Sequence, residues 1–260
     1  MSHHKVSTSI VGLATAAMLL SAFPAAAQTT TTTSKSAATT AQRLAVVINR
    51  SNTDIAERIA DLNKLNTRVQ ALKNESASEK SAIAATVQTN IAGLTALQSK
   101  IDADTDAKTA RTDAQTIATS FRIYALIVPQ GSILASADRV TTIGGLMTAL
   151  GTKIQARVTV DQTAGKDVSA ITAAMTDYTA KIADANSQAQ TAQTGVVHLV
   201  PDQGNTATAA SNKAALVAAR ANIKMATQDL QAARKDVTTM LQGLKALGSK
   251  GTTATSTATQ

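Results

Sequence analysis

The fold is decided by a stretch near the C-terminal end, AALVAARANIKMATQDLQAARKDVTTMLQGLKAL, which covers residues 214–247. An apolar residue recurs every seven positions, and a second apolar row runs three positions behind the first. The rows are Leu216, Ile223, Leu230, Val237 and Leu244, and Ala219, Ala226, Ala233, Met240 and Leu247. Two such rows form one seam along an α-helix, and that seam is stable only when it is buried against other helices. The stretch therefore predicts a long helix, over 206–247, inside a helical bundle.

The same periodicity recurs along most of the chain. It predicts further helices over 41–73, 76–101, 105–126, 132–158 and 168–192. Ser76 and Glu79 form the capping-box pattern just after the first of these, and so short a connection predicts an antiparallel hairpin. The fold class that follows is all-α, an elongated antiparallel bundle of coiled-coil hairpins with about six helices and disordered Thr-rich ends. We expect the Ala-rich sixth helix to pack along the first.

Two details of the middle helices are less regular. Pro129 is expected to stop the third helix, because proline disfavours a helical residue before it. The preceding stretch, Arg122 to Val128, is rich enough in apolar and β-branched residues to form a short strand instead of a helix end. Gly144, Gly145 and Gly151 weaken the fourth helix, and we expect them to allow another helix to approach closely.

The N-terminal end predicts export. Residues 1–27 have the features of a signal peptide: Lys5, an apolar core over 10–20, and three small residues before a cleavage site at Gln28. The alternative is a retained N-terminal anchor, although the apolar core is shorter than the roughly 20 residues that span a bilayer. The expected domains are the signal peptide, a Thr/Ser linker at 28–40, the bundle at 41–247 and a disordered tail at 248–260. The expected location is periplasmic, cell-surface or secreted.

Composition restricts the chemistry. The chain has no Cys, which excludes disulfides, zinc–thiolate sites and thiol nucleophiles. Aromatic residues make up only 2%, which argues against the thick core and pocket of a compact enzyme. The formal net charge of +8 indicates attraction to an anionic envelope polymer or lipid surface. Because the basic residues look scattered along the sequence, no specific nucleic-acid recognition is expected. A protein partner or self-association through the helical seams is the other expected contact.

A weak metal candidate lies between the second and third helices. Asp102, Asp104 and Asp106 alternate as at the start of a calcium-binding loop. However, Ala107 occupies the position where the turn of such a loop needs Gly, and Asp113 stands in place of the usual bidentate Glu. A helix–helix turn with an Asp cap explains the pattern more simply. We expect no catalytic residues and no cofactor.

A candidate interaction segment lies before the sixth helix. Val196, Val197, Leu199 and Val200 form an apolar run in the one long connection of the chain. They are the expected tip for binding a partner or a membrane. The alternative is that they form a hydrophobic plug over the end of the bundle.

Three stretches resemble a known group of proteins. They are KIDADTD at 100–106, SFRIYALIVPQG at 120–131 and ASADRV at 135–140. They are similar to uncharacterised exported helical proteins of ultra-small candidate-phylum bacteria, over about residues 56–158. The resemblance implies a bacterial envelope or secreted protein and supplies no catalytic residues. The expected function is that of a non-enzymatic structural or interaction protein of the bacterial envelope or exterior, a rod-like helical bundle that binds an anionic envelope component or a protein partner. The alternative is a helical-hairpin adaptor or chaperone for another exported protein, which predicts a seam left open.

Overall fold

The computed structural model describes residues 29–253, which fold entirely into helices and their connections. The elements are α1 (Thr29–Gln70), α2 (Ala77–Asp102), α3 (Ala107–Thr119), a π-helical turn η1 (Ile123–Ile127), α4 (Val128–Thr163), α5 (Ser169–Val196) and α6 (Thr206–Thr253). The all-α class and the antiparallel packing are confirmed. The predicted signal peptide, residues 1–27, lies outside the described residues.

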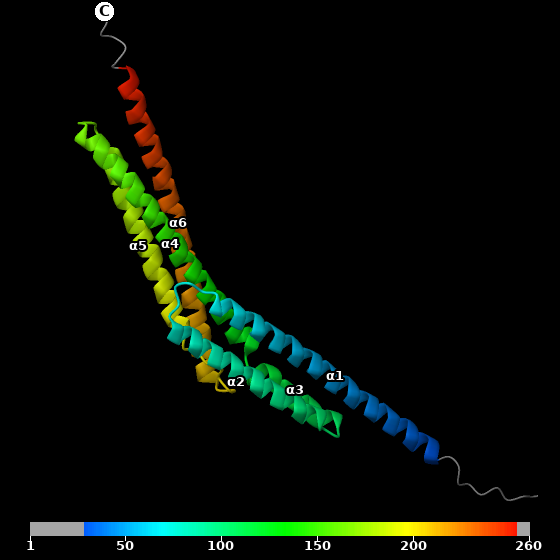
Figure 1. Ribbon diagram of the computed structural model, residues 1–260. Helices are drawn as coiled ribbons and strands as arrows, with labels where there is room; N and C mark the ends of the chain where they lie inside the picture. Colours follow the sequence, from blue (N-terminus) through cyan, green and yellow to red (C-terminus); the bar gives the residue numbers. More distant parts are fainter. Residues whose placement is uncertain (1–28, 254–260) are drawn as a thin grey trace, which may run out of the picture.

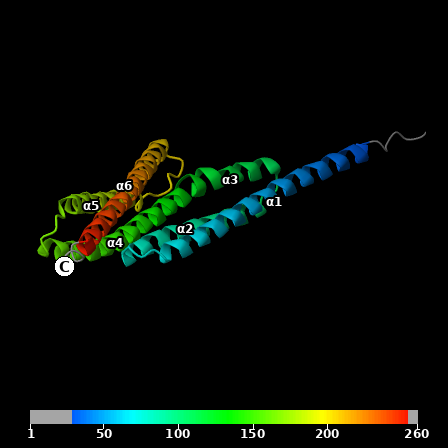
Figure 2. The ribbon, with the colours of Figure 1, turned by 90° about the horizontal axis from the view of Figure 1, so that it is seen from above.

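The helices form two arms that meet at an elbow (Figure 1). One arm contains α1, α2 and α3, and the other contains α4, α5 and α6. The α3–η1–α4 segment, Ala107–Thr163, is a bent rod of 57 residues that runs through both arms (Figures 1 and 2). The expected packing of the last helix along the first is wrong. After the connection at 197–205, α6 turns back along α5 and also contacts α4.

The bent rod is the one helix among the described residues that is long and apolar enough to cross a membrane by length and composition. Core helices of soluble proteins share this property. In the rod, 44% of the most apolar stretch of 18 residues is buried inside the molecule. Its apolar character is therefore partly accounted for by packing between helices.

The predicted seams are the observed core. Every apolar and small position predicted for the fourth and fifth helices is buried: Ile133, Ala137, Val140, Gly144, Met147, Gly151, Ile154, Val158, Val168, Ile171, Met175, Tyr178, Ile182, Ala185, Ala189 and Ala192. One apolar cluster fills the first arm and the elbow, and a second fills the other arm. The capping box of Ser76 and Glu79 at the start of α2 is also confirmed.

Pro129 does not stop a helix, and no strand forms beside it. The break falls earlier, at Arg122, whose φ of 50° places it in the left-handed region. The chain then makes the π-turn, in which the Val128 N–H donates to the carbonyl of Ile123. Pro129 lies in the first turn of α4, where an N–H is not needed and a fixed φ favours the helix. The π-turn thus lets the chain continue in helical form across the elbow.

The glycine prediction holds at two of three positions. A Cβ on Gly151 would lie 2.8 Å from Cε1 of Tyr178, and one on Gly144 would lie 2.5 Å from Oδ1 of Asn186. Both glycines therefore allow α5 to approach α4 closely. The prediction is wrong for Gly145, where a Cβ would meet no atom within 4 Å.

The two end helices are longer than predicted. α1 begins at Thr29, within the segment predicted as a linker at 28–40, and α6 continues to Thr253, past the predicted tail start at 248. Residues 29–40 contain neither Pro nor Gly, so nothing in them forces the helix to begin later. α1 projects beyond the end of α3 in Figure 2. Gln28 and residues 254–260 lie outside the described residues.

Candidate functional site

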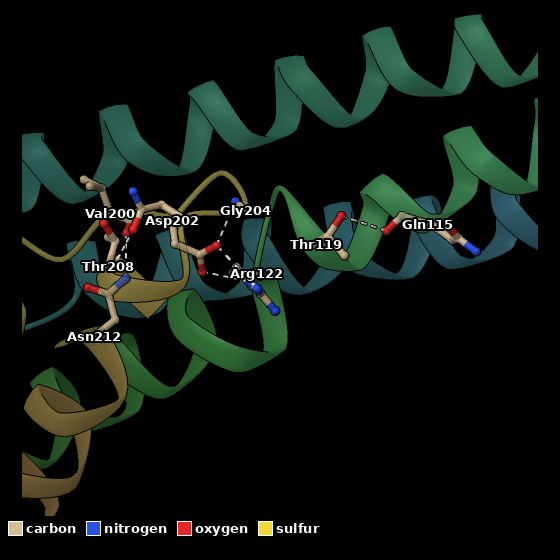
Figure 3. Close-up of polar contacts among 9 residues, drawn as sticks. Gln115, Thr119, Arg122, Val200, Asp202, Gly204, Thr208 and Asn212 are labelled. Atoms are coloured by element: carbon tan, nitrogen blue, oxygen red, sulfur yellow. Dashed lines mark hydrogen bonds and ion pairs between the residues drawn. The ribbon is translucent and has the colours of Figure 1, made fainter. Parts of the chain in front are cut away.

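A buried ion pair fixes the elbow. Nε of Arg122 lies 2.8 Å from Oδ2 of Asp202, whose side chain is only 3% exposed (Figure 3). The same carboxylate accepts a hydrogen bond from the backbone N–H of Gly204 at 2.8 Å. Burial alone would raise the pKa of Asp202, but the Gly204 N–H and the Arg122 guanidinium outweigh it and hold that pKa below its ordinary value. The pair therefore joins η1 to the connection that precedes α6.

The four residues predicted as an interaction segment lie mostly inside the protein. Val196 and Val197 are buried, Leu199 is half-buried, and Val200 is 55% exposed. Gln130 of α4 donates from Nε2 to the carbonyl of Val196 at 2.6 Å. This placement fits the hydrophobic-plug alternative for three of the residues and leaves Val200 at the surface.

Two of the three aspartates of the metal candidate have partners of their own. Asp102 accepts a hydrogen bond from Nδ2 of Asn52 at 2.8 Å. Asp106, and not Asp104, caps α3. Burial and the nearby charge of Asp113 raise the pKa of Asp104. Among residues 29–253, no group of three His, Asp or Glu side chains is arranged to hold a metal ion.

An acidic cluster joins the α1–α2 turn to the other arm. Glu75 is buried, and its Oε2 accepts a hydrogen bond from Nε2 of Gln193 at 2.8 Å. Burial, together with the charges of Glu79 and Asp138, raises the pKa of Glu75 to about 7, although the hydrogen bond from Gln193 and the charge of Lys80 oppose the shift. Oδ1 of Asp138 also accepts the backbone N–H groups that follow α1. No pattern in the sequence indicated this contact between distant helices.

We expect Glu75→Gln to make the protein more stable at pH 8 and to leave it unchanged near pH 4. The folded protein holds the Glu75 proton to a higher pH than the unfolded chain does. The stability associated with that proton is therefore complete below pH 4.5, the ordinary pKa of a glutamate side chain, and is lost as the pH rises to about 7. After allowance for screening, the gain in Tm at pH 8 is about 2–4 °C, the effect of roughly 1 kcal/mol at this size.

Thermal unfolding followed by circular dichroism between pH 4 and 8 measures this effect. Glu57→Gln, at an exposed position on α1, is the matched control. A difference in melting temperature between the wild-type protein and Glu75→Gln that is the same at every pH would contradict the prediction.

Three adjoining hollows form one long depression, which we call the α4–α6 groove. They have volumes of about 330, 360 and 400 Å³ from the elbow outward. The first and second hollows share Arg220, and the second and third share Ser136 and Ile223. The groove follows the line along which α6 lies over η1 and α4. Its floor is apolar and includes the half-buried Ile143 and Ile223.

The groove is lined by positive charge. Its basic residues are Arg122, Arg139, Lys213, Arg220 and Arg234. Its one acidic residue is Asp202, which Arg122 already neutralises. Within the part of the chain that the structure describes, no carboxylate forms an ion pair with the other four side chains.

The helix α6 separates its charges by face. At 3.6 residues per turn, its six basic residues between 213 and 245 fall within an arc of about 100°. Asp229 and Asp236 lie on the opposite side, where Lys181 of α5 approaches Asp229 at 3.6 Å. The basic residues therefore only look scattered in the sequence. The spacing of Lys213, Arg220 and Arg234 by seven and fourteen residues is the signal that could have revealed the groove.

The groove is chemically suited to binding. Arginine remains protonated at all physiological pH values, so a row of arginines attracts anions but does not transfer protons. An apolar floor adds affinity for a ligand with an apolar surface. No protein-family model, curated protein or solved structure matches the chain.

Proposed function

We propose that the chain is a non-enzymatic, exported interaction protein of the bacterial envelope or exterior. Its bent helical bundle binds an anionic envelope component or protein partner through the α4–α6 groove. The observation that carries this proposal is the set of four basic side chains along the groove that form no ion pair within residues 29–253, in a chain of net charge +8. The signal-peptide pattern and the resemblance to exported helical proteins support the location.

A second candidate function is an adaptor or chaperone for another exported protein. Such a protein needs an apolar seam that its own helices leave open. The floor of the groove, with Ile143 and Ile223 only half-buried, favours this candidate.

Sedimentation with isolated cell envelopes tests the proposed function. We expect the mature protein, from Gln28 onward, to sediment with the envelopes at low salt and to be released as NaCl rises, because salt screens exposed charges. The double variant Arg220→Glu/Arg234→Glu should lose most of this binding. Arg43→Glu/Arg68→Glu, at two exposed positions on α1, lowers the net charge equally and should retain it.

The control variant distinguishes binding at the groove from attraction by the net charge of the whole protein. Equal losses in the two double variants would show that total charge, and not the groove, attracts the protein. No sedimentation of the wild-type protein at any salt concentration would refute an envelope partner.

A further inference from the structure

We propose that the occupant of the α4–α6 groove is an amphipathic helix of a partner protein, with an apolar stripe flanked by acidic residues. The inference rests on the proposed function, in which this groove binds an anionic partner, and it names the class of that partner. Helix docking would make the three-helix arm locally a four-helix bundle, which is a common way to complete an open apolar seam.

The floor of the groove favours a helix over an anionic polymer. The apolar side chains that stay half-exposed along it are Val128 and Ile143 from α4 and Ile223 from α6, whereas Ile133, Val140 and Leu230 beneath them are buried. A sugar–phosphate or polyphosphate chain gains little from such a surface, because it has few apolar atoms to bury. An amphipathic helix lays its apolar face into a groove of this kind.

The basic residues of α6 that line the groove recur at the seven-residue spacing of a helical heptad. Lys213, Arg220 and Arg234 stand seven and fourteen residues apart, so they recur along α6 at multiples of about 10.5 Å. A partner helix with acidic residues seven positions apart has the same repeat and can meet all three charges. Arg139 lies on the α4 side of the groove, where it can meet a second acidic row.

The length of the basic row sets the length of the partner. Lys213 and Arg234 are separated by 21 residues of α6, or about 31 Å. Thr227 occupies the third of the four heptad positions, where a basic residue is missing. The best partner therefore spans about six turns and has its acidic residues concentrated toward its two ends.

A synthetic peptide tests the inference. The probe is a fluorescently labelled amphipathic peptide of about 21 residues, the length of the groove, with Leu along one stripe and Glu on both flanks. Its control has the same composition in scrambled order, so that the charge is equal but no stripe forms. Fluorescence anisotropy with the whole mature protein should show saturable binding of the amphipathic peptide at least about tenfold tighter than of the scrambled one.

Two kinds of variant locate the binding. Arg220→Glu/Arg234→Glu should weaken binding of the amphipathic peptide by about tenfold or more, whereas Arg43→Glu/Arg68→Glu should leave it within about twofold. Ser136→Trp fills the point that two hollows share and leaves every charge in place. It should weaken binding of the amphipathic peptide, whereas an anionic polymer held by charge alone would be bound as before. Since the chain has no other Trp, the emission of this residue also reports whether the variant is folded.

The outcomes separate the two proposals. Equal affinity for the amphipathic and scrambled peptides, or equal loss in the groove and control variants, would overturn the helix partner. If anionic vesicles or envelopes bind through Arg220 and Arg234 while neither peptide binds, the helix partner is wrong and the proposed function stands. If neither envelopes nor peptides bind, both proposals fall.

Discussion

Replacing Arg122 with Ala is expected to destabilise the protein by about 2–3 kcal/mol. The substitution leaves the carboxylate of Asp202, which is 3% exposed, with the Gly204 N–H but without its cation. Breaking a buried ion pair in this way costs about 3–5 kcal/mol, and the lower figure here allows for the 32% exposure of the Arg122 side chain. Urea unfolding measures the change without adding salt.

A second substitution at the same position separates the ion pair from backbone strain. Arg122 has a positive φ of 50°, which glycine adopts more readily than alanine. Arg122→Gly should therefore be more stable than Arg122→Ala by about 1 kcal/mol, although both lack the ion pair. Equal stability of the wild-type protein and Arg122→Ala would show that the pair contributes nothing net to the elbow.

Replacing Gly131 with Leu is expected to cost about 3 kcal/mol or more, because over-packing a filled site displaces its neighbours. A Cβ at this buried glycine of α4 would overlap the side chain of Leu65 from α1. The two residues thus bring the arms together at the elbow. Thermal and urea unfolding measure the loss, and Leu65→Ala in the same chain should restore part of it by making room.

Gly145 supplies the matched control for this substitution. It is an exposed glycine of the same helix, and a Cβ there would meet no atom within 4 Å. Gly145→Leu, the same substitution, should stabilise the protein by up to about 1 kcal/mol through helix propensity alone. A Gly131→Leu protein as stable as the wild type would mean that α1 and α4 are not in close contact at this level.

The sequence predicted the parts of this fold that depend on periodicity. Positions such as Val140, Ile154 and Ile182 recur at helical spacing, and each is buried in the structure. A seam that must be buried determines which face of a helix points inward. It does not determine which helix covers that face, and the position of α6 was accordingly predicted wrongly.

The elbow was beyond prediction for a related reason. Pro129 is an ordinary stop signal, but a π-turn before it and the contact between Arg122 and Asp202, 80 residues away in sequence, let the helical path continue. Local propensity carries no information about so distant a partner. The candidate site was missed for another reason. The regular spacing of Lys213, Arg220 and Arg234 was visible in the sequence, but the basic residues were interpreted as scattered.

The bent rod has a mechanical consequence. Ala107–Thr163 runs through both arms without an extended linker, so the angle between the arms is set by a helix and by the contacts at one corner. The molecule should behave as a bracket, which holds whatever binds each arm at a fixed separation and transmits a pull on one arm to the other. Because the chain contains no Cys, a pair of introduced thiols, one on each arm, can carry distance probes without background labelling. A single narrow distance distribution is the expected signature of such a bracket.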